Sequence, residues 1–423
     1  MIKEIKNELL GESYFKIKHP SGLSIYVMKK EGYKSSYAIF GTAFGSADNH
    51  YITADNQEVT LPDGTAHFLE HKLFESEEKD AFERFSQTGA MANAYTSFDR
   101  TCYLFQCSSN FYTNLETLLD FVQSPYFTEQ TVQKEQGIIG QEIKMYEDSP
   151  EWQATMGVLA ALYENCAVNK DIAGDVKSIA EITPETLYSA YNGFYNLNNM
   201  VLSVVGDVEP DKVLEVCDRV LKTSERTPAK SIIASEPLNS FKKKSVKKMQ
   251  IGLPVFAFGY KEPHSEIKSL KEKILTVILN QILIGNMSPL YQSLIEEGLI
   301  NDEFESEYFT SRNYSAVLFT GTSKDPEAVK AKFEEEIKRV RKNGIDKELF
   351  ECVVKELYGD YIVFFNSVER LSNALCECEF SSYGLFDEME IYKTLTVEDA
   401  EEILKEKYDL DASSISIILP EDN

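Results

Sequence analysis

Two histidines and a glutamate stand close together in the segment GTAHFLEHKLFE, residues 64–75. His67 and His71 are four positions apart, and Glu70 directly precedes the second histidine. On a helix, residues four apart lie one turn above one another, so both imidazoles can point at one metal ion while Glu70 lies on the same side. The alternative is a helix surface that carries two histidines without a metal.

The side chains of this segment suit a catalytic zinc ion. Two imidazole nitrogens are typical zinc donors, and a catalytic site needs a third protein ligand and a fourth position left to water. A carboxylate beside that water can accept its proton during attack on a peptide carbonyl. The segment therefore indicates a zinc site with Glu70 as the general base, and a motif this short must be judged by its surroundings.

The surrounding sequence predicts alternating strands and helices. Apolar and polar residues alternate in the strand-like runs, and the helix-like runs carry cap residues such as Thr128 and Gly89 at their ends. In chain order the predicted elements are strands over 22–30 and 35–49, helices over 65–75 and 78–89, a hairpin over 90–109 that turns at 98–100, helices over 114–125 and 128–148, and a strand, turn and helix over 199–221.

The second half of the chain repeats this plan. The predicted elements there are a strand over 247–260, a helix over 268–283, two strands and a helix over 303–337, a helix over 346–362 and a strand over 414–422. The lysine-rich, turn-rich stretch between the halves is typical of a solvated linker. We therefore predict an α+β protein of two homologous halves, each an antiparallel sheet packed by helices, with an N-terminal domain over 1–222, a basic linker over 223–248 and a C-terminal domain over 249–423.

Composition excludes several classes of function. The formal net charge of −26 disfavours binding to nucleic acid or to anionic membranes. No run approaches the roughly 20 apolar residues of a membrane span, and the charged N-terminus lacks the apolar stretch of a signal peptide. The seven cysteines include no C-x-x-C pair, so we interpret them as reduced thiols. We expect a cytoplasmic protein.

The chain resembles the M16, or pitrilysin-type, family of zinc metallopeptidases. His-x-x-Glu-His is the inverted zinc-peptidase motif of the inverzincins. It is followed by MANAYTSFDRTCYLF (91–105), LETLLDFVQSPYF (115–127) and VQKEQGIIGQEI (132–143), in the order and at about the distances of that family. The likeness extends more weakly over the second half. It is closest to short bacterial M16B-type subunits, which are similar to the beta subunit of mitochondrial processing peptidase, and it implies the M16/LuxS-like fold.

The resemblance also implies the remaining site residues. Glu142 matches the family's third zinc ligand, so that His67, His71 and Glu142 would hold one Zn²⁺ per chain. Glu135 matches a second functional glutamate, and the spacing of seven residues is nearly two helical turns, which places both on one face. Asn93, Ala94, Tyr95 and Thr96 match the edge strand to which a substrate peptide is added through main-chain hydrogen bonds.

The second half departs from the family pattern. Self-sufficient members carry an arginine and, seven positions later, a tyrosine that help to hold the substrate carbonyl. In the matching stretch, SPLYQSLIEEGLINDEF (288–304), Ile295 stands in place of the arginine, and Ile300 or Asn301 in place of the tyrosine. Arg312 and Tyr314, two apart on a predicted strand, are the alternative source of these groups.

These features predict a zinc-dependent endopeptidase subunit that hydrolyses peptides in an enclosed chamber. Because the arginine and tyrosine are missing, we expect a second M16 subunit to supply them, as a heterodimer or alternatively a homodimer. Two other functions stay open. One is a non-catalytic scaffold or peptide-binding subunit, and the other is a protease dedicated to maturing one modified peptide.

Overall fold

The computed structural model describes residues 2–77, 80–223, 227–263, 268–381 and 383–421. The chain forms two compact units. Unit 1 comprises 1–143, 171–232 and 362–386, and unit 2 comprises 144–170, 233–361 and 387–423. The predicted domains follow chain order, whereas each unit also takes in a segment from the other half of the chain. Residues 224–226 of the predicted linker lie outside the described residues.

Unit 1 contains a seven-stranded sheet in the order β1-β2-β3-β9-β4-β8-β7. All neighbours in it are antiparallel except β3 and β9, which are parallel. The edge strand on one side is β7, which pairs with β8. The strands are β1 (Ile2–Asn7), β2 (Glu12–Lys18), β3 (Ser24–Lys29), β4 (Ser36–Thr42), β7 (Met91–Thr96), β8 (Thr101–Cys107) and β9 (Met200–Gly206), and a small second sheet contains β5 (His50–Ile52), β6 (Glu58–Thr60) and β10 (Lys230–Ser231).

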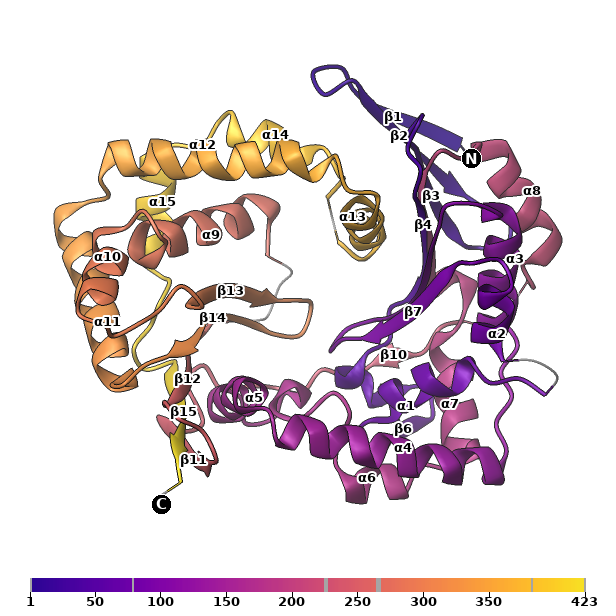
Figure 1. Cartoon of the computed structure of the whole chain (residues 1–423), viewed down its shortest axis with the longest axis horizontal. Helices are drawn as coiled ribbons and strands as arrows, with labels where there is room; N and C mark the ends of the chain where they lie inside the picture. The colour runs from indigo at the N-terminus through magenta and orange to yellow at the C-terminus, as the bar shows by residue number, and fades with distance from the viewer. Residues whose placement is uncertain (1, 78–79, 224–226, 264–267, 382, 422–423) are drawn as a thin grey trace. The chain divides into compact units, whose positions relative to one another are not determined.

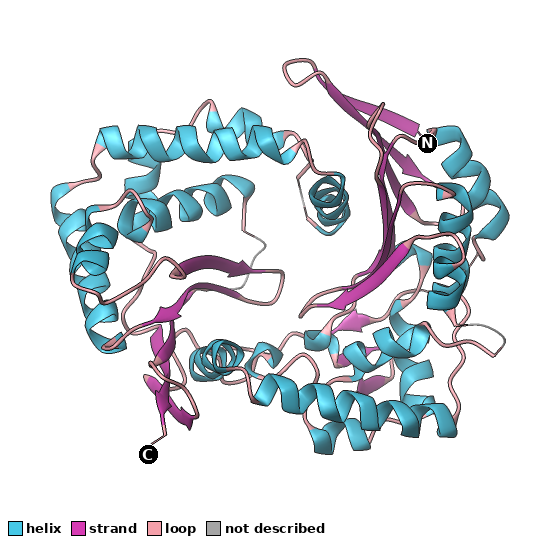
Figure 2. Ribbon diagram, in the orientation of Figure 1, coloured by secondary structure: helices cyan, strands magenta, loops and turns pink. Residues whose placement is uncertain are grey.

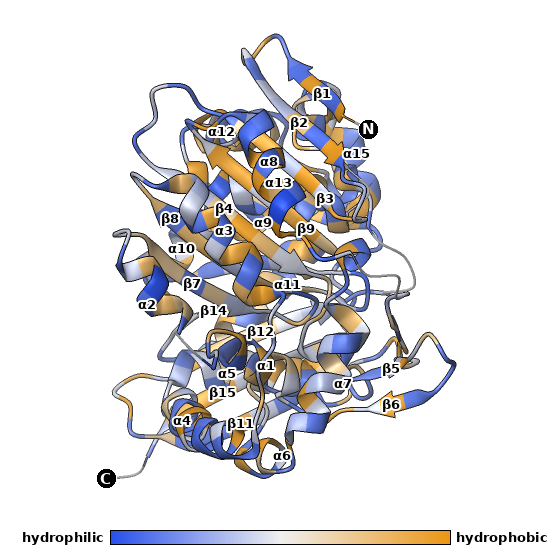
Figure 3. Cartoon of the chain, turned by 90° about the vertical axis from the view of Figure 1, so that its right-hand side faces the viewer, coloured by the Kyte–Doolittle hydropathy of each residue, from blue (hydrophilic) through white to orange (hydrophobic). Residues whose placement is uncertain are grey.

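Helices cover both faces of the large sheet. Its central strands β3, β4 and β9 are therefore buried along almost their whole length. These strands appear as hydrophobic bands in Figure 3. One face is covered by α13 and the other by α3 and α8 (Figure 1). The helices are α1 (Thr65–Leu73), α2 (Ala81–Ser86), α3 (Phe111–Val122), α4 (Glu129–Glu147), α6 (Val176–Ala180), α7 (Pro184–Phe194), α8 (Pro210–Val220) and α13 (Val368–Phe380), with short 3-10 turns at Ser46–Asp48 and Leu197–Asn199.

Unit 2 repeats the sheet-and-helix plan on a smaller scale. Its five-stranded sheet has the order β11-β15-β12-β14-β13, and β11 and β15 are its parallel pair. Helix α5 packs on the sheet, as α13 does in unit 1 (Figure 2). The elements are α5 (Pro150–Leu162), a 3-10 turn at Ala167–Asn169, β11 (Lys244–Met249), β12 (Val255–Lys261), α9 (Leu270–Ile284), α10 (Pro289–Glu296), β13 (Glu305–Thr310), β14 (Ser315–Thr322), α11 (Pro326–Asn343), α12 (Lys347–Phe364), α14 (Asp387–Tyr392), α15 (Val397–Leu404) and β15 (Ser413–Pro420).

The predicted α+β class with two helix-packed sheets matches this architecture, with some differences in detail. Each of the two larger sheets contains one parallel pair in addition to its antiparallel pairs. An N-terminal hairpin, β1–β2, was not predicted, and β11 occupies residues at the end of the stretch interpreted as a linker. Within the described residues, no single helix is long and apolar enough to span a membrane, and only α9 and α10 together, bent by 43°, meet that test by length and composition.

Candidate metal and catalytic site

Helix α1 carries the histidine motif and is buried on most sides. Phe68, Leu69 and Leu73 belong to the hydrophobic core of unit 1. The helix begins after Gly64, whose φ of 88° lies in the left-handed region. A Cβ at Gly64 would lie 2.3 Å from the carbonyl oxygen of Ala173, so the glycine allows the backbone before α1 to pack directly on residues 173–174. This contact fixes where the helix starts.

The structure brings His67, His71 and Glu142 together, with one ligand atom from each within 4.8 Å of the others. The Nε2 atom of His67 lies 3.6 Å from Oε1 of Glu142, and the Nε2 atom of His71 lies 3.5 Å from Oε2. Donor atoms around a tetrahedral zinc ion with bonds of about 2.0–2.1 Å are about 3.3 Å apart. Each imidazole nitrogen lies at about this separation from one of the two oxygens of the Glu142 carboxylate, so the three side chains fit zinc in chemistry and these two pairs fit it in spacing.

Glu135 contacts the opposite edge of the His71 ring. Its Oε1 atom lies 3.0 Å from Nδ1 of His71, and its side chain is buried on α4 together with Val132, Ile139 and Ile143. Burial by itself lowers the pKa of His71, but the hydrogen bond from Glu135 and the charges of Glu70 and Glu142 outweigh it and raise the pKa above 6.5. The ring of His71 is thus held among carboxylates that favour its positively charged form. The buried Nδ1 of His67 has no hydrogen-bonding partner among the described residues.

Glu70 is buried and contacts strand β7. Its Oε2 atom accepts a hydrogen bond of 2.7 Å from Oγ1 of Thr96. The hydroxyls of Tyr103, which is buried, and Tyr195, which is partly buried, lie 2.8 Å apart nearby. Burial raises the pKa of both tyrosines, and the negative charge of Glu70 adds to the shift. The hydroxyls of both tyrosines therefore stay neutral beside Glu70.

The predicted substrate strand is the edge strand β7. Asn93, Ala94, Tyr95 and Thr96 lie on it, paired through β8 with Leu104, Tyr103, Cys102 and Thr101. The side chain of Asn93 is exposed and accepts a hydrogen bond of 2.9 Å from the N–H of Ala94. β7 is free of a second strand partner in the described sheet, which is the arrangement that β-strand addition requires.

Helix α13, from the second half of the sequence, supports this hairpin. The hydroxyl of Tyr95 donates to Oδ1 of Asn373 at 3.0 Å, and Nη1 of Arg100 donates to Glu377 at 3.0 Å. These residues are more than 270 positions apart in the sequence. The position of the predicted substrate strand thus depends on α13, a helix that lies in the C-terminal half of the sequence.

In unit 2 the residues at the positions of the missing arginine and tyrosine are Ile295 on α10, Ile300 and Asn301. Ile300 is buried, and the amide of Asn301 donates to Glu303. The expectation that Arg312 and Tyr314 share a strand face is wrong, because both lie in the turn between β13 and β14. The ring of Tyr314 is buried and stacks on Phe309 at 4.3 Å.

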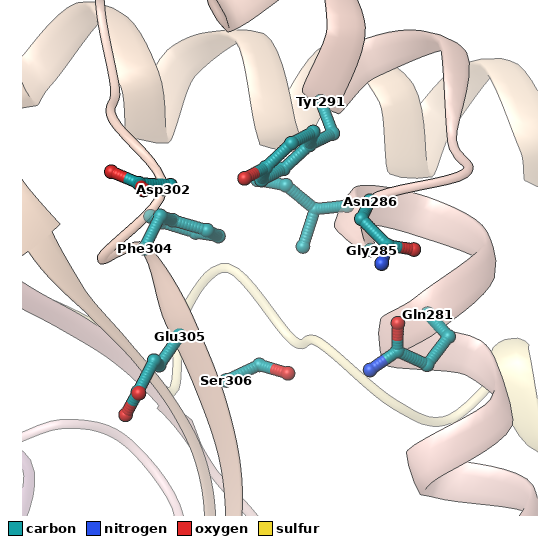
Figure 4. Close-up of a pocket in the computed structure, with 9 residues that line it drawn as sticks. Gln281, Gly285, Asn286, Tyr291, Asp302, Phe304, Glu305 and Ser306 are labelled. Atoms are coloured by element: carbon teal, nitrogen blue, oxygen red, sulfur yellow. The ribbon is translucent and has the colours of Figure 1, made fainter. Parts of the chain in front are cut away.

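A cavity of about 350 Å³ in unit 2 lies beside this stretch (Figure 4). The end of α9, the start of α10 and the start of β13 form its walls. Its lining is Gln281, Ile284, Gly285, Asn286, Tyr291, Asp302, Phe304, Glu305 and Ser306. No lysine or arginine is among the described residues of this lining, so the lining itself supplies no cation of the kind that an arginine at 295 would bring.

Sequence reasoning missed the side-chain contacts of Thr96 and the tyrosine pair. Thr96 was assigned only a main-chain role on the substrate strand. The predicted hairpin turn at 98–100 does not by itself identify Thr101 as the residue opposite Thr96, and no sequence signal shows that helix α1 brings Glu70 to the same place. The tyrosines are 92 positions apart and have no shared motif.

Comparison with known proteins gives consistent likenesses. The family description "Insulinase (Peptidase family M16)" matches residues 55–176, and "Peptidase M16 inactive domain" matches residues 181–357. The chain is 37% identical over 427 residues to YmfH of Bacillus subtilis, described as a zinc protease, and the match covers 99% of this chain and 100% of YmfH. The human mitochondrial-processing peptidase subunit beta is 30% identical over 158 residues, which is 36% of this chain and 32% of that protein.

A solved structure resembles the whole chain. An M16-like peptidase from Alicyclobacillus acidocaldarius superposes with a TM-score of 0.93 at 33% identity, covering 97% of this chain and 99% of that one. This agreement confirms the predicted fold class of two helix-packed sheets.

Proposed function

Because this chain belongs to the M16 family of zinc proteases, we propose that it hydrolyses peptides with His67, His71 and Glu142 as the ligands of one zinc ion and Glu70 as the general base. The observation that carries this proposal is the convergence of the three ligand atoms within 4.8 Å. Two separate helices, α1 and α4, supply them.

Each side chain of the site has a separate task. A zinc ion bound here supplies the Lewis acidity that activates water and polarises a peptide carbonyl. His67, His71 and Glu142 hold the ion, and Glu135 orients His71 through its Nδ1. Glu70 accepts the proton of the attacking water and passes it to the leaving amine. It directly precedes the ligand His71 and is hydrogen-bonded to Thr96.

We propose β7 as the strand to which the substrate peptide is added. Main-chain pairing to Asn93, Ala94, Tyr95 and Thr96 would fix the peptide without reading its side chains, so varied sequences would be accepted. The location of β7 at the sheet edge, beside the helix that carries Glu70, supports this assignment.

We further propose that a second M16 subunit completes the activity, within a chamber that the two chains enclose. Ile295 has no side-chain donor for a developing oxyanion, and the amide of Asn301 donates to Glu303. Tyr314 is engaged in packing against Phe309, which argues against it as a substitute. A partner that carries the missing pair would supply what unit 2 lacks.

The chemistry is tested by comparing wild type, Glu70→Gln and the surface control Glu129→Gln. Each purified chain is loaded with zinc, mixed with the candidate partner and assayed with a quenched peptide. Glu70→Gln is expected to retain zinc and lose turnover, while Glu129→Gln, exposed at the start of α4, matches wild type. Equal turnover by Glu70→Gln would exclude Glu70 as the base. A wild-type chain without stoichiometric zinc would favour the scaffold function.

The partner is tested separately by purification from the native cell and by mass measurement of the complex. A heterodimer is expected, with activity lost when the partner's arginine is replaced. A chain that purifies alone and is active would contradict the need for a partner while leaving the zinc chemistry intact.

A further inference from the structure

We propose that the side-chain hydroxyl of Thr96 is a positioning group that holds Glu70 in the orientation needed for proton transfer. This inference rests on the proposed role of Glu70 and adds a residue to it. Thr96 thereby has two tasks, since its main chain lies on β7, the predicted substrate strand, and its side chain reaches the carboxylate on α1.

The contact between the two side chains is short and enclosed. Oγ1 of Thr96 donates to Oε2 of Glu70 at 2.7 Å, and Glu70 is only 8% exposed. A hydroxyl has one proton, so a bond of this length commits the hydroxyl of Thr96 to the carboxylate. A glutamate has several rotatable bonds, and a charge-assisted hydrogen bond to one oxygen restricts them in a corner that water reaches poorly.

The neighbouring strand does not divert the hydroxyl of Thr96 from Glu70. Thr101 is the register partner of Thr96 across the β7–β8 pair, and its Oγ1 lies 3.5 Å from Oγ1 of Thr96. Thr101 itself is fully buried and donates to the carbonyl oxygen of Phe44 at 2.8 Å. Because the proton of Thr101 is used on Phe44, Thr101 does not compete for Glu70. Threonine is also β-branched, which limits its χ1 rotamers on a strand.

The arrangement links peptide addition to the base. A peptide paired to β7 takes its register from the main chain of residues such as Thr96, and the carboxylate of Glu70 is held by the side chain of the same residue. Thr96 alone then determines the distance between an added peptide and the base, because its main chain pairs with the peptide and its side chain holds Glu70. Loss of the hydroxyl should therefore impair the chemical step more than peptide binding.

The test compares Thr96→Val with Thr96→Ser in the quenched-peptide assay, with zinc-loaded protein and the partner subunit present. Valine keeps the branched shape and removes the hydroxyl, whereas serine keeps the hydroxyl. We expect Thr96→Val to lower kcat by about 10- to 100-fold with little change in KM, and Thr96→Ser to recover most of the rate. Thr60→Val, at an exposed position of β6, is the control for a threonine-to-valine change on a strand and should match wild type.

Two further measurements separate positioning from binding and from folding. Zinc content should be equal in all variants. A peptide should bind Glu70→Gln and Glu70→Gln/Thr96→Val with equal affinity. The proposal is overturned if Thr96→Val has the kcat of wild type, if valine and serine are equally slow, or if the loss lies in KM or in peptide affinity. Turnover by Glu70→Gln would instead refute the proposed function itself.

Discussion

Oε1 of Glu135 lies 3.0 Å from Nδ1 of His71, while Nε2 of the same ring lies 3.5 Å from Oε2 of Glu142. One imidazole is thus held between two carboxylates of a single helix, seven residues apart. A carboxylate at Nδ1 favours the tautomer with its proton on that nitrogen, which leaves the lone pair of Nε2 for a metal. The relationship assigns different tasks to the two glutamates, and each can be tested.

Removing the charge of Glu135 should weaken metal binding without abolishing it. Glu135→Gln still offers an amide oxygen to His71 but no longer raises the basicity of the ring. We expect zinc affinity to fall by about 10- to 100-fold. Competition with a chelator at fixed pH measures the change, with Glu129→Gln as the matched control on the same helix. Unchanged affinity would show that Glu135 does not act through His71.

Moving the carboxylate of Glu142 by one position should abolish stoichiometric zinc. The double variant Gln141→Glu/Glu142→Gln keeps the charge and composition of α4 but turns the carboxylate by about 100° around the helix. Metal analysis after dialysis should then give far less than one zinc per chain. Wild type should give about one zinc per chain, as a site with three protein ligands for one ion requires. Full zinc content in the double variant would mean that Glu142 is not a ligand.

Local periodicity explains which parts of the site could be predicted. The spacing of His67 and His71, and of Glu135 and Glu142, fixes each pair on one helical face. The family resemblance supplied the link between the two helices, which periodicity cannot give. The contact of Thr96 with Glu70 was beyond reach, because it depends on how closely α1 packs on β7.

Long-range docking explains what could not be predicted. Asn373 and Glu377 hold the β7–β8 hairpin from a helix that follows more than 270 residues later. Residues 244–248 of β11 were interpreted as linker because their lysines are typical of solvated chain. β11 is an edge strand, however, and exposed lysines are common on edge strands. Arg312 and Tyr314 were expected on a strand face, but the β13–β14 turn begins before them.

A methyl group at Gly64 should disturb the start of α1. Gly64→Ala adds a Cβ at a φ of 88° and 2.3 Å from the carbonyl oxygen of Ala173, so the backbone must move. We expect a loss of about 1–3 kcal/mol in the free energy of unfolding, together with weaker zinc retention because the histidines shift with the helix.

The control for this substitution is Gly137→Ala in the middle of α4, where a Cβ meets nothing within 4 Å. Alanine is the better helix former, so that variant should be unchanged or more stable by up to about 1 kcal/mol. Thermal unfolding with and without zinc compares the two. Equal Tm values for both variants would contradict the close approach at Gly64.

Stability in unit 2 should depend on the buried pair of Glu236 and Lys261. The carboxylate of Glu236 accepts hydrogen bonds from the N–H groups of Glu164, Asn165 and Cys166 at 2.8–2.9 Å and from Nζ of Lys261 at 2.8 Å. Glu236→Gln would leave the ammonium of Lys261 buried without its counter-charge. We expect a loss of about 3–5 kcal/mol near neutral pH.

The difference between wild type and Glu236→Gln should also depend on pH. Burial alone would raise the pKa of Glu236, but the hydrogen bonds from Lys261 and the three N–H groups outweigh it and hold the pKa below its ordinary 4.5. The contribution of the carboxylate is therefore complete above the unfolded pKa and is lost as the pH falls through the folded one. Trp152, the single tryptophan, lies on α5 in unit 2, so its fluorescence during denaturant unfolding reports on this unit. Wild type and variant should differ strongly at pH 7 and converge as the pH falls through the lowered pKa of Glu236, and a constant difference across that range would mean that the charge of Glu236 does not stabilise the fold.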